Sequence, residues 1–157
     1  METANKPAGF TIRVYGLFLD RGNRVLLSDE FRLGQRMTKF PGGGLELGEG
    51  PEDCLLRECR EELGQEVEIL GHFYTTGFYQ PSFLLPITHQ LISIYYRIRI
   101  SEPYLFDVRR RPFDYGQDTE GAQSFRFREI MSMEEDELTF PIDRHVFSML
   151  QRSMDVS

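Results

Sequence analysis

The stretch from Gly43 to Gln65 reads GGLELGEGPEDCLLRECREELGQ and carries the strongest structural signal in the chain. Pro51 suits the first turn of a helix, and Gly64 supplies a signal to stop. The apolar side chains between them recur at helical spacing and cover one arc, at Leu55, Leu56, Cys59 and Leu63. The stretch therefore predicts a helix that packs one face against a core.

A neighbouring arc of the same helix carries three carboxylates. Glu58, Glu61 and Glu62 stand at positions i, i+3 and i+4, so a helical backbone places them on one face. Like charges at this spacing repel each other. Taken alone, a run of charge on a helix is more often a solvated face. A hard divalent cation with oxygen ligands between the carboxylates would account for the arrangement.

The spacing of residues in this stretch resembles the Nudix box of the Nudix hydrolases. Its seven fixed positions are all met, at Gly43, Glu49, Arg57, Glu58, Glu61, Glu62 and Gly64. At roughly 7% usage per residue type, a chance match at a given start is on the order of one in 10⁸. The resemblance favours metal binding over a solvated face. It also implies an α/β fold, a Nudix-type α/β/α sandwich with a mixed β-sheet, as a single Nudix hydrolase domain over residues 1–157.

The resemblance implies an activity as well. We expect Mg²⁺-dependent hydrolysis, with Mn²⁺ as the alternative ion, of the diphosphate linkage in a small nucleoside diphosphate derivative. A nucleotide sugar, an ADP-ribose-like compound and a nucleoside triphosphate all remain open. The alternatives are a non-catalytic nucleotide sensor on the same fold and a diphosphate isomerase. Pro81 lies 16 residues after the box, near the spacing of an ADP-ribose pyrophosphatase signature, but a single proline is a weak marker.

The resemblance also suggests roles inside the box. Glu61 and Glu62 are expected to be metal ligands, and Glu58 either a ligand or the base that takes a proton from the attacking water. The carbonyl of Gly42 is a further candidate ligand. Arg57 and Glu49 are expected to form an ion pair that fixes the loop against the helix and orients Glu58. Gly43 and Gly64 are expected to be structural.

Residues outside the box complete the candidate site. Members of the family often add a carboxylate from a later loop, and Glu120 is our choice, with Asp118 as the competitor. Arg36 and Lys39 precede the glycine loop and are candidates to meet phosphate. Arg109, Arg110 and Arg111 are weaker candidates. Aromatic side chains on which a base could stack are Phe73, Tyr74, Phe78, Tyr79 and Phe83.

Composition limits the class of protein. A chain of 157 residues with 40% hydrophobic residues favours one domain with a proper core. The net charge of −7 argues against long nucleic acid as a partner. No apolar stretch is long enough for a membrane span or a signal segment, and Cys54 and Cys59 are badly placed to pair, so a cytoplasmic protein is expected. The resemblance allows for a homodimer, because many relatives are dimers.

Periodicity predicts strands around the box helix. They are expected at Phe10 to Asp20, Arg24 to Leu27, Thr38 to Phe40, Val67 to Thr76, Gln90 to Ile100 and Ser124 to Arg128, with a polar connection at Ser28 to Arg36. In the strand from Gln90, the face carrying Ser93 and Tyr95 is expected to be partly wet. Short and longer helices are expected at Ser132 to Leu138 and at Asp143 to Arg152.

Overall fold

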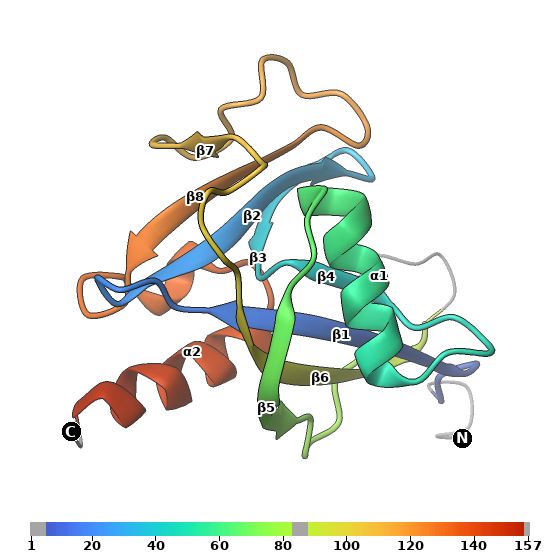
Figure 1. The fold of residues 1–157 in the computed structure, drawn as a ribbon. Helices are drawn as coiled ribbons and strands as arrows, with labels where there is room; N and C mark the ends of the chain where they lie inside the picture. Colours follow the sequence, from blue (N-terminus) through green and yellow to red (C-terminus); the bar gives the residue numbers. More distant parts are fainter. Residues whose placement is uncertain (1–5, 83–87, 156–157) are drawn as a thin grey trace.

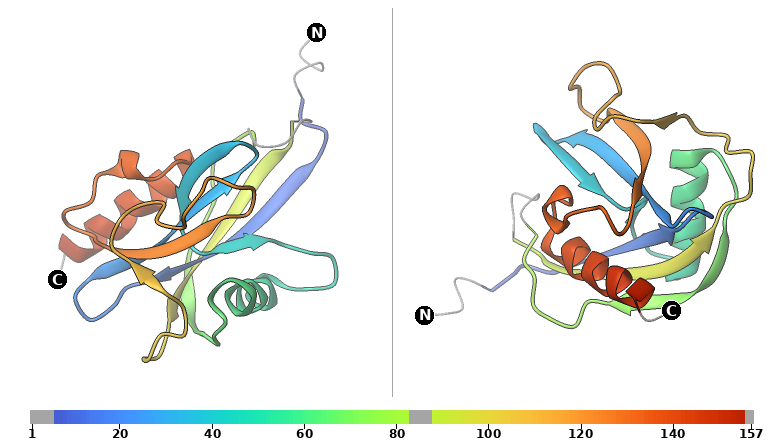
Figure 2. Two further views of the ribbon diagram at one scale, coloured as in Figure 1. Left: turned by 90° about the horizontal axis from the view of Figure 1, so that it is seen from above. Right: turned by 90° about the vertical axis from the view of Figure 1, so that its left-hand side faces the viewer.

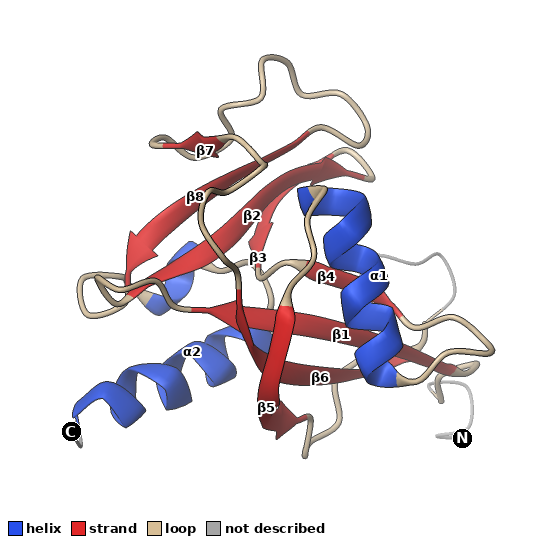
Figure 3. Cartoon of the chain, in the orientation of Figure 1, coloured by secondary structure: helices blue, strands red, loops and turns tan. Residues whose placement is uncertain are grey.

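The structure is a computed structural model, and it describes residues 6–82 and 88–155. Figure 1 shows the arrangement and Figure 3 colours it by secondary structure. In chain order the elements are β1 (Phe10–Phe18), β2 (Arg24–Arg32), β3 (Gln35–Lys39), β4 (Gly42–Gly44), α1 (Pro51–Leu63), β5 (Glu68–Thr75), β6 (Gln90–Arg99), β7 (Val108–Arg109), β8 (Gln123–Glu129), the 3₁₀ turn η2 (Glu135–Glu137) and α2 (Pro141–Asp155).

The strands of the described residues form two four-stranded sheets. One has the order β4-β1-β6-β5 and the other β3-β2-β8-β7. Each sheet contains a parallel pair, β1 with β6 and β7 with β8, among antiparallel neighbours. Both sheets are therefore mixed, where the sequence predicts a single mixed sheet.

The two helices cover opposite sides of the sheets, as the two views of Figure 2 show. Strand β1 explains how, because successive side chains of a strand point to opposite faces. Val14 and Phe18 pack in the cluster that contains the apolar face of α1. Tyr15 and Leu17 pack in the cluster that contains α2. The α/β/α arrangement predicted from the box is confirmed.

Helix α1 begins and ends where the sequence signals predict. Pro51 occupies its first position, and Gly64 caps its end with φ 66° in the left-handed region, where its N–H bonds the carbonyl of Arg60. Cys54 and Cys59 are free and buried, and burial raises the pKa of both thiols to about 12. The cysteines of α1 therefore serve as small core residues.

The polar connection expected at residues 28–36 is wrong. Strands β2 and β3 form a hairpin there, and Asp29 and Glu30 lie in it at 0% and 1% exposure. These acids are tolerated inside because each has a buried cationic partner, Arg126 for Asp29 and Lys39 for Glu30. Ion pairs with Arg126 of β8 and Lys39 of β3 therefore stabilise as a strand a run of residues whose polar composition predicts a connection.

The expectation that this face of β6 is partly wet holds only towards its end, where Arg97 is partly buried and Arg99 is exposed. Ser93 and Tyr95 are 1% and 0% exposed, because α2 covers that face of the sheet. Helix α2 itself begins two residues earlier than predicted, at Pro141. The short helix expected from Ser132 is only the turn η2, whose N-cap is Glu134.

None of the helices among the described residues is long and apolar enough to cross a membrane. A single domain over residues 1–157 stays a prediction.

Candidate functional site

The solvent exposure of the three carboxylates on the acidic face of α1 differs. The side chain of Glu58 is 15% exposed and that of Glu61 is 58% exposed. Glu62 is partly buried, at the edge that the helical wheel places nearest the apolar face. The three carboxylates therefore meet solvent to different extents although they share one face.

Glycines in β4 let the strand approach this face closely. A Cβ added to Gly43 would lie 2.3 Å from Cδ of Glu58. Gly42 has φ 148°, and its Cβ would lie 2.1 Å from the carbonyl oxygen of Val14. The Gly42 N–H donates to Oε2 of Glu62 at 3.3 Å. Strand β4 thus forms one wall of the acidic site. A side chain at Gly42 would collide with the backbone of β1, and one at Gly43 would displace the carboxyl group of Glu58.

Arg57 joins the loop before α1 to the acidic face. Its Nε and Nη2 donate to the two oxygens of Glu49 at 3.0 and 2.7 Å, which is the expected ion pair. Nη2 also donates to the carbonyl of Gly44, and Nη1 donates to Oε1 of Glu58 at 3.0 Å. The hydrogen bonds from Arg57 hold the pKa of Glu49 down at about 2. One guanidinium therefore fixes the loop, the strand and Glu58 together.

A buried polar network lies behind β4. Lys39, with its side chain 4% exposed, pairs with Glu30 at 2.8 Å and donates to the Gly42 carbonyl at 3.3 Å. Gln123 of β8 donates to the same Glu30 carboxylate at 3.1 Å. Burial alone would lower the pKa of Lys39, but the charge of Glu30 raises it above its usual value. Lys39 is therefore a buried cation with a fixed position.

Glu62 lies between this network and the other acids of α1. Burial raises its pKa to about 7, against the opposing charge of Lys39, and the charges of Glu30 and Glu58 add to the rise. In residues 6–82 and 88–155, no three His, Cys, Asp or Glu side chains converge into a preformed metal cage. The acidic face is thus an open set of carboxylates.

The other candidate residues divide into two groups. Arg36 is exposed and pairs with Asp118 at 2.9 Å, and Tyr115 donates to Asp118 at 2.7 Å. Glu120 instead accepts the N–H of Leu33 at 2.8 Å and, with Lys39, lines a cavity. Within the described chain, Arg36 and Asp118 do not line that cavity.

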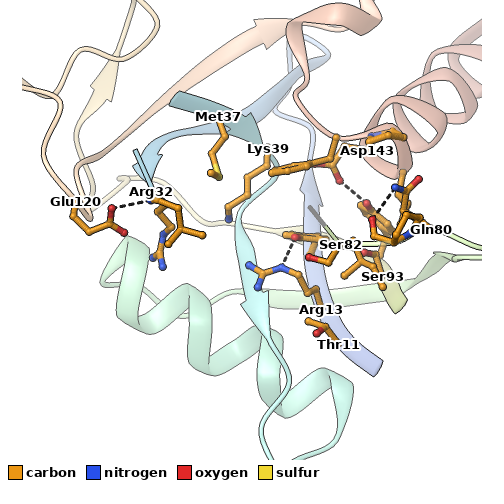
Figure 4. A pocket seen from close by; sticks show the side chains of 18 residues that line it. Thr11, Arg13, Arg32, Met37, Lys39, Gln80, Ser82, Ser93, Glu120 and Asp143 are labelled. Atoms are coloured by element: carbon orange, nitrogen blue, oxygen red, sulfur yellow. Dashed lines mark hydrogen bonds between the residues drawn. The ribbon is translucent and has the colours of Figure 1, made fainter. Parts of the chain in front are cut away.

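That cavity, which we call the inner cavity, has a volume of about 260 Å³. Figure 4 shows Lys39 in its wall between Glu120 on one side and Asp143 on the other. Its lining is Thr11, Arg13, Tyr15, Arg32, Leu33, Met37, Lys39, Gln80, Pro81, Ser82, Leu91, Ser93, Tyr95, Glu120, Phe140, Pro141, Ile142 and Asp143.

A second, more open cavity of about 620 Å³ lies at the end of α1. Glu61 and Glu62 line it together with Arg109 of β7 and segments 105–107 and 114–116. Gln65 ties this loop to the helix, because its amide donates to the carbonyl of Ser101 and accepts the N–H of Leu105 at 2.7 and 2.9 Å. The segment between β6 and β8 therefore forms a wall of the acidic site.

The expected stacking residues lie elsewhere. Phe83 falls outside the described residues, and Phe73, Tyr74, Phe78 and Tyr79 are not part of the inner cavity lining. Among the lining residues that sequence reasoning missed are Arg13, Tyr95, Gln80 and Asp143. Gln123 was missed in the network behind β4. Strand alternation placed Tyr95 on a wet face, and Asp143 looked like an ordinary helix-start residue. No local signal distinguished them.

The fold is similar to that of known proteins. The chain is similar in structure to the MutT protein from Methanosarcina mazei Go1, with a TM-score of 0.61, 17% identity, and coverage of 93% of this chain and 96% of that one. It is similar to a NUDIX hydrolase from Nitrosomonas europaea, with a TM-score of 0.63, 17% identity, and coverage of 97% and 96%. At these identities the likeness concerns the fold.

Two relatives named RNA pyrophosphohydrolase match a short segment. The protein from Sulfurovum sp. (strain NBC37-1) is 58% identical over 36 residues, which are 22% of this chain and 23% of that protein. The protein from Marinomonas sp. (strain MWYL1) is 46% identical over 43 residues, or 26% and 27%. The matches thus span about a quarter of each relative. The family model of the NUDIX domain matches residues 9–147, and the chain therefore belongs to the Nudix family.

Proposed function

We propose that the protein is a Mg²⁺- or Mn²⁺-dependent pyrophosphohydrolase that cleaves the diphosphate linkage of a small nucleoside diphosphate derivative. The family and the name of the two relatives support a hydrolase of phosphoric anhydride bonds. The observation that carries the proposal is the acidic face of α1, pressed against the glycines of β4 and held there by Arg57.

The residues present fit a divalent cation. All the donors are carboxylate or carbonyl oxygens, which hard cations prefer. The raised pKa of Glu62 reflects burial beside other negative charges, and a cation would relieve it. Our proposed ligands are Glu58, Glu61, Glu62, the carbonyl of Gly42 and Glu120. When bound, the cation stabilises the negative charge that spreads over the phosphoryl oxygens.

We prefer Glu120 to Asp118 as the additional ligand. Asp118 is already held by Arg36 and Tyr115, and these contacts lower the pKa of its carboxyl group. Glu120 lines the inner cavity with Lys39, whose hydrogen bond to the Gly42 carbonyl links it to β4. The same contacts favour Lys39 over Arg36 as the cation nearest a bound phosphate.

The chain's own residues position the reacting groups. Arg57 limits the freedom of Glu58 through a charge-assisted hydrogen bond, so that Glu58 can act as ligand or as base from a fixed place. Lys39 orients the Gly42 carbonyl from behind the strand, and the second lone pair of that oxygen stays available. Because these contacts exist before the substrate binds, little reorganisation is needed during the reaction.

A small substrate is favoured over a nucleic acid. The net charge of −7 disfavours the binding of a long polyanion. The inner cavity, at about 260 Å³, is somewhat smaller than the roughly 300–1,000 Å³ of pockets that hold drug-sized ligands, so it suits one ring system. We further propose a cytoplasmic protein that acts as one domain; the family resemblance allows a homodimer as its assembly.

The test is hydrolysis of ADP-ribose, a nucleotide sugar and a nucleoside triphosphate with Mg²⁺ or Mn²⁺, with products separated by chromatography. Glu61→Gln and Glu62→Gln should each lower kcat/KM by roughly 100-fold or more, because each removes a charge that faces the reacting phosphates. Glu52→Gln, an exposed acid on the first turn of the same helix, is the matched control and should keep full activity.

Three outcomes would contradict the proposal. Turnover that survives both substitutions would rule out the acidic face as the metal site. Saturable nucleotide binding without any product after long incubation would indicate a sensor. A rearranged diphosphate in place of hydrolysis products would indicate an isomerase.

A further inference from the structure

The inner cavity contains a carboxyl group that the proposed hydrolysis does not use. Asp143 lies in the first turn of α2, is 1% exposed and lines the cavity. Its Oδ1 accepts a hydrogen bond from the hydroxyl of Tyr95. Its Oδ2 is buried and has no hydrogen-bond partner among the described residues. One half of this carboxylate is therefore satisfied and the other half is not.

An unpaired buried carboxylate oxygen is unfavourable, because it loses water without gaining a donor. Burial raises the pKa of Asp143 to about 6, although the Tyr95 hydrogen bond and the charges of Lys39 and Arg13 oppose the rise. Both cations have other partners. Lys39 pairs with Glu30, and Nε of Arg13 donates to the hydroxyl of Tyr15 at 2.6 Å. A hydrogen-bond donor on a ligand would satisfy Oδ2.

The rest of the cavity suits a flat ring. Aromatic and aliphatic side chains supply most of its wall, among them Tyr15, Met37, Leu91, Tyr95 and Phe140. Ligand pockets typically combine such apolar walls with a few polar groups that fix orientation. Asp143 and the small polar groups beside it, shown in Figure 4, fill that second role.

The cavity adjoins the acidic site through Lys39. This residue lines the cavity and also donates to the carbonyl of Gly42, whose N–H donates to Glu62. A ring in the cavity and phosphates at the acids of α1 can therefore belong to one molecule, which makes a nucleotide the matching ligand.

We infer that Asp143 is a specificity-determining residue that accepts a hydrogen bond from an amino group on the base of the nucleotide substrate. The site would thereby select amino-bearing bases over their oxo counterparts, because an oxo group would place a second acceptor against Oδ2. Tyr95 is the positioning residue, since its hydroxyl fixes which oxygen faces the base. This inference rests on the proposed function for the identity of the ligand as a nucleotide.

The test compares bases in which an oxo group replaces the amino group, a change that also turns the adjacent ring nitrogen from an acceptor into a donor. Titration calorimetry with ADP against IDP, and with CDP against UDP, measures binding without requiring turnover. The wild-type protein should bind the amino-bearing member of at least one pair on the order of 10- to 100-fold more tightly, as expected for a hydrogen bond to a charged group. Equal affinities within both pairs, or no saturable binding of any of the four, would overturn the inference.

Asp143→Asn gives a sharper result because Tyr95 fixes its orientation. The Tyr95 hydroxyl needs an acceptor, so the amide oxygen should take the place of Oδ1 and the NH₂ group the place of Oδ2. The preference should then be lost or reversed towards IDP or UDP. Asp136→Asn, at an exposed aspartate in η2, is the matched control and should keep the wild-type preference.

A second variant tests the assigned roles independently, in case Asp143→Asn fails to fold. Tyr95→Phe should weaken the preference for amino-bearing bases without reversing it, because the carboxyl group loses its fixed orientation. An unchanged ratio of affinities in both Asp143→Asn and Tyr95→Phe would refute the assigned roles. Discriminating binding without any hydrolysis would leave this inference intact while the proposed function fails, so the two can be told apart.

Discussion

Gly43 lies directly against the carboxyl group of Glu58, and this contact ties the conformation of β4 to the chemistry of α1. Glycine is required at position 43 for a steric reason. A Cβ there would come within 2.3 Å of the Glu58 carboxyl carbon and within 2.6 Å of both its oxygens. The atoms that this Cβ would meet belong to the end of the Glu58 side chain, so the backbone of α1 need not move. Glu58 would turn away instead.

Gly43→Ala should therefore damage the site more than the fold. We expect kcat/KM for the diphosphate substrate to fall on the order of 10- to 100-fold, as for other losses of an orienting contact. The thermal midpoint should change little. Kinetics on the folded variant, with circular dichroism as the check on structure, measure both.

Gly71→Ala in β5 is the matched control, since a Cβ there meets nothing within 4 Å. It should leave kcat/KM unchanged. Full activity in Gly43→Ala would mean that the position of Glu58 against β4 is unimportant for the reaction.

Strands β2 and β8 are joined by more than their backbone ladder. Arg126 of β8 donates from Nε and Nη2 to the carboxylate of Asp29 at 2.6 and 3.2 Å, and the two side chains are 8% and 0% exposed. A buried pair of this kind contributes little compared with an apolar pair, but breaking it leaves an uncompensated charge. The partnership also explains why an aspartate can lie inside the sheet.

Arg126→Met should lower the free energy of unfolding by about 3–5 kcal/mol, because Asp29 would stay buried without its cation. Urea denaturation measures the loss. Arg128→Met is the matched control on the same strand. Its partner Glu137 is 26% exposed and Arg128 itself is 33% exposed, so about 1 kcal/mol or less is expected. Similar losses in both variants would contradict the assigned burial effect.

Buried carboxyl groups should give the stability of the whole molecule a distinct pH dependence. Asp143 has a pKa of about 6 in the folded protein against 3.8 as its ordinary value. The folded state therefore binds this proton more tightly than the unfolded chain does. The resulting stabilisation is fully present below pH 3.8 and is lost as the pH rises through about 6. Glu49, with a pKa of about 2, acts in the opposite direction at low pH.

Asp143→Asn isolates this contribution because asparagine does not titrate. Relative to the variant, the wild-type protein should lose about 1 kcal/mol of unfolding free energy between pH 5 and pH 7. Urea denaturation of both proteins at the two pH values measures the difference. A difference that does not change with pH would show that Asp143 titrates normally in the folded protein. Asp136→Asn, exposed in η2, should give such a constant difference.

Local features of the chain were readable without a structure. The bounds of α1 follow from Pro51 and Gly64, and the shared face of Glu58, Glu61 and Glu62 follows from helical spacing. The ion pair of Arg57 with Glu49 was expected from the box and is present. The helix bounds and the shared face depend on neighbours along the chain, whereas the ion pair is what the resemblance to the Nudix box implies.

Tertiary structure decided the environment of every polar residue far from its partner. The sequence could not distinguish Asp29 and Glu30 in a buried hairpin from a solvated loop, because their cations come from β8 and β3. Tyr95 and Asp143, 48 residues apart, meet only because α2 covers β6. The sequence by itself determined the acidic helix α1, because the formation of this helix depends on residues that are neighbours along the chain. The cavity beside it depends on which surfaces the folded sheets bring together and remove from water.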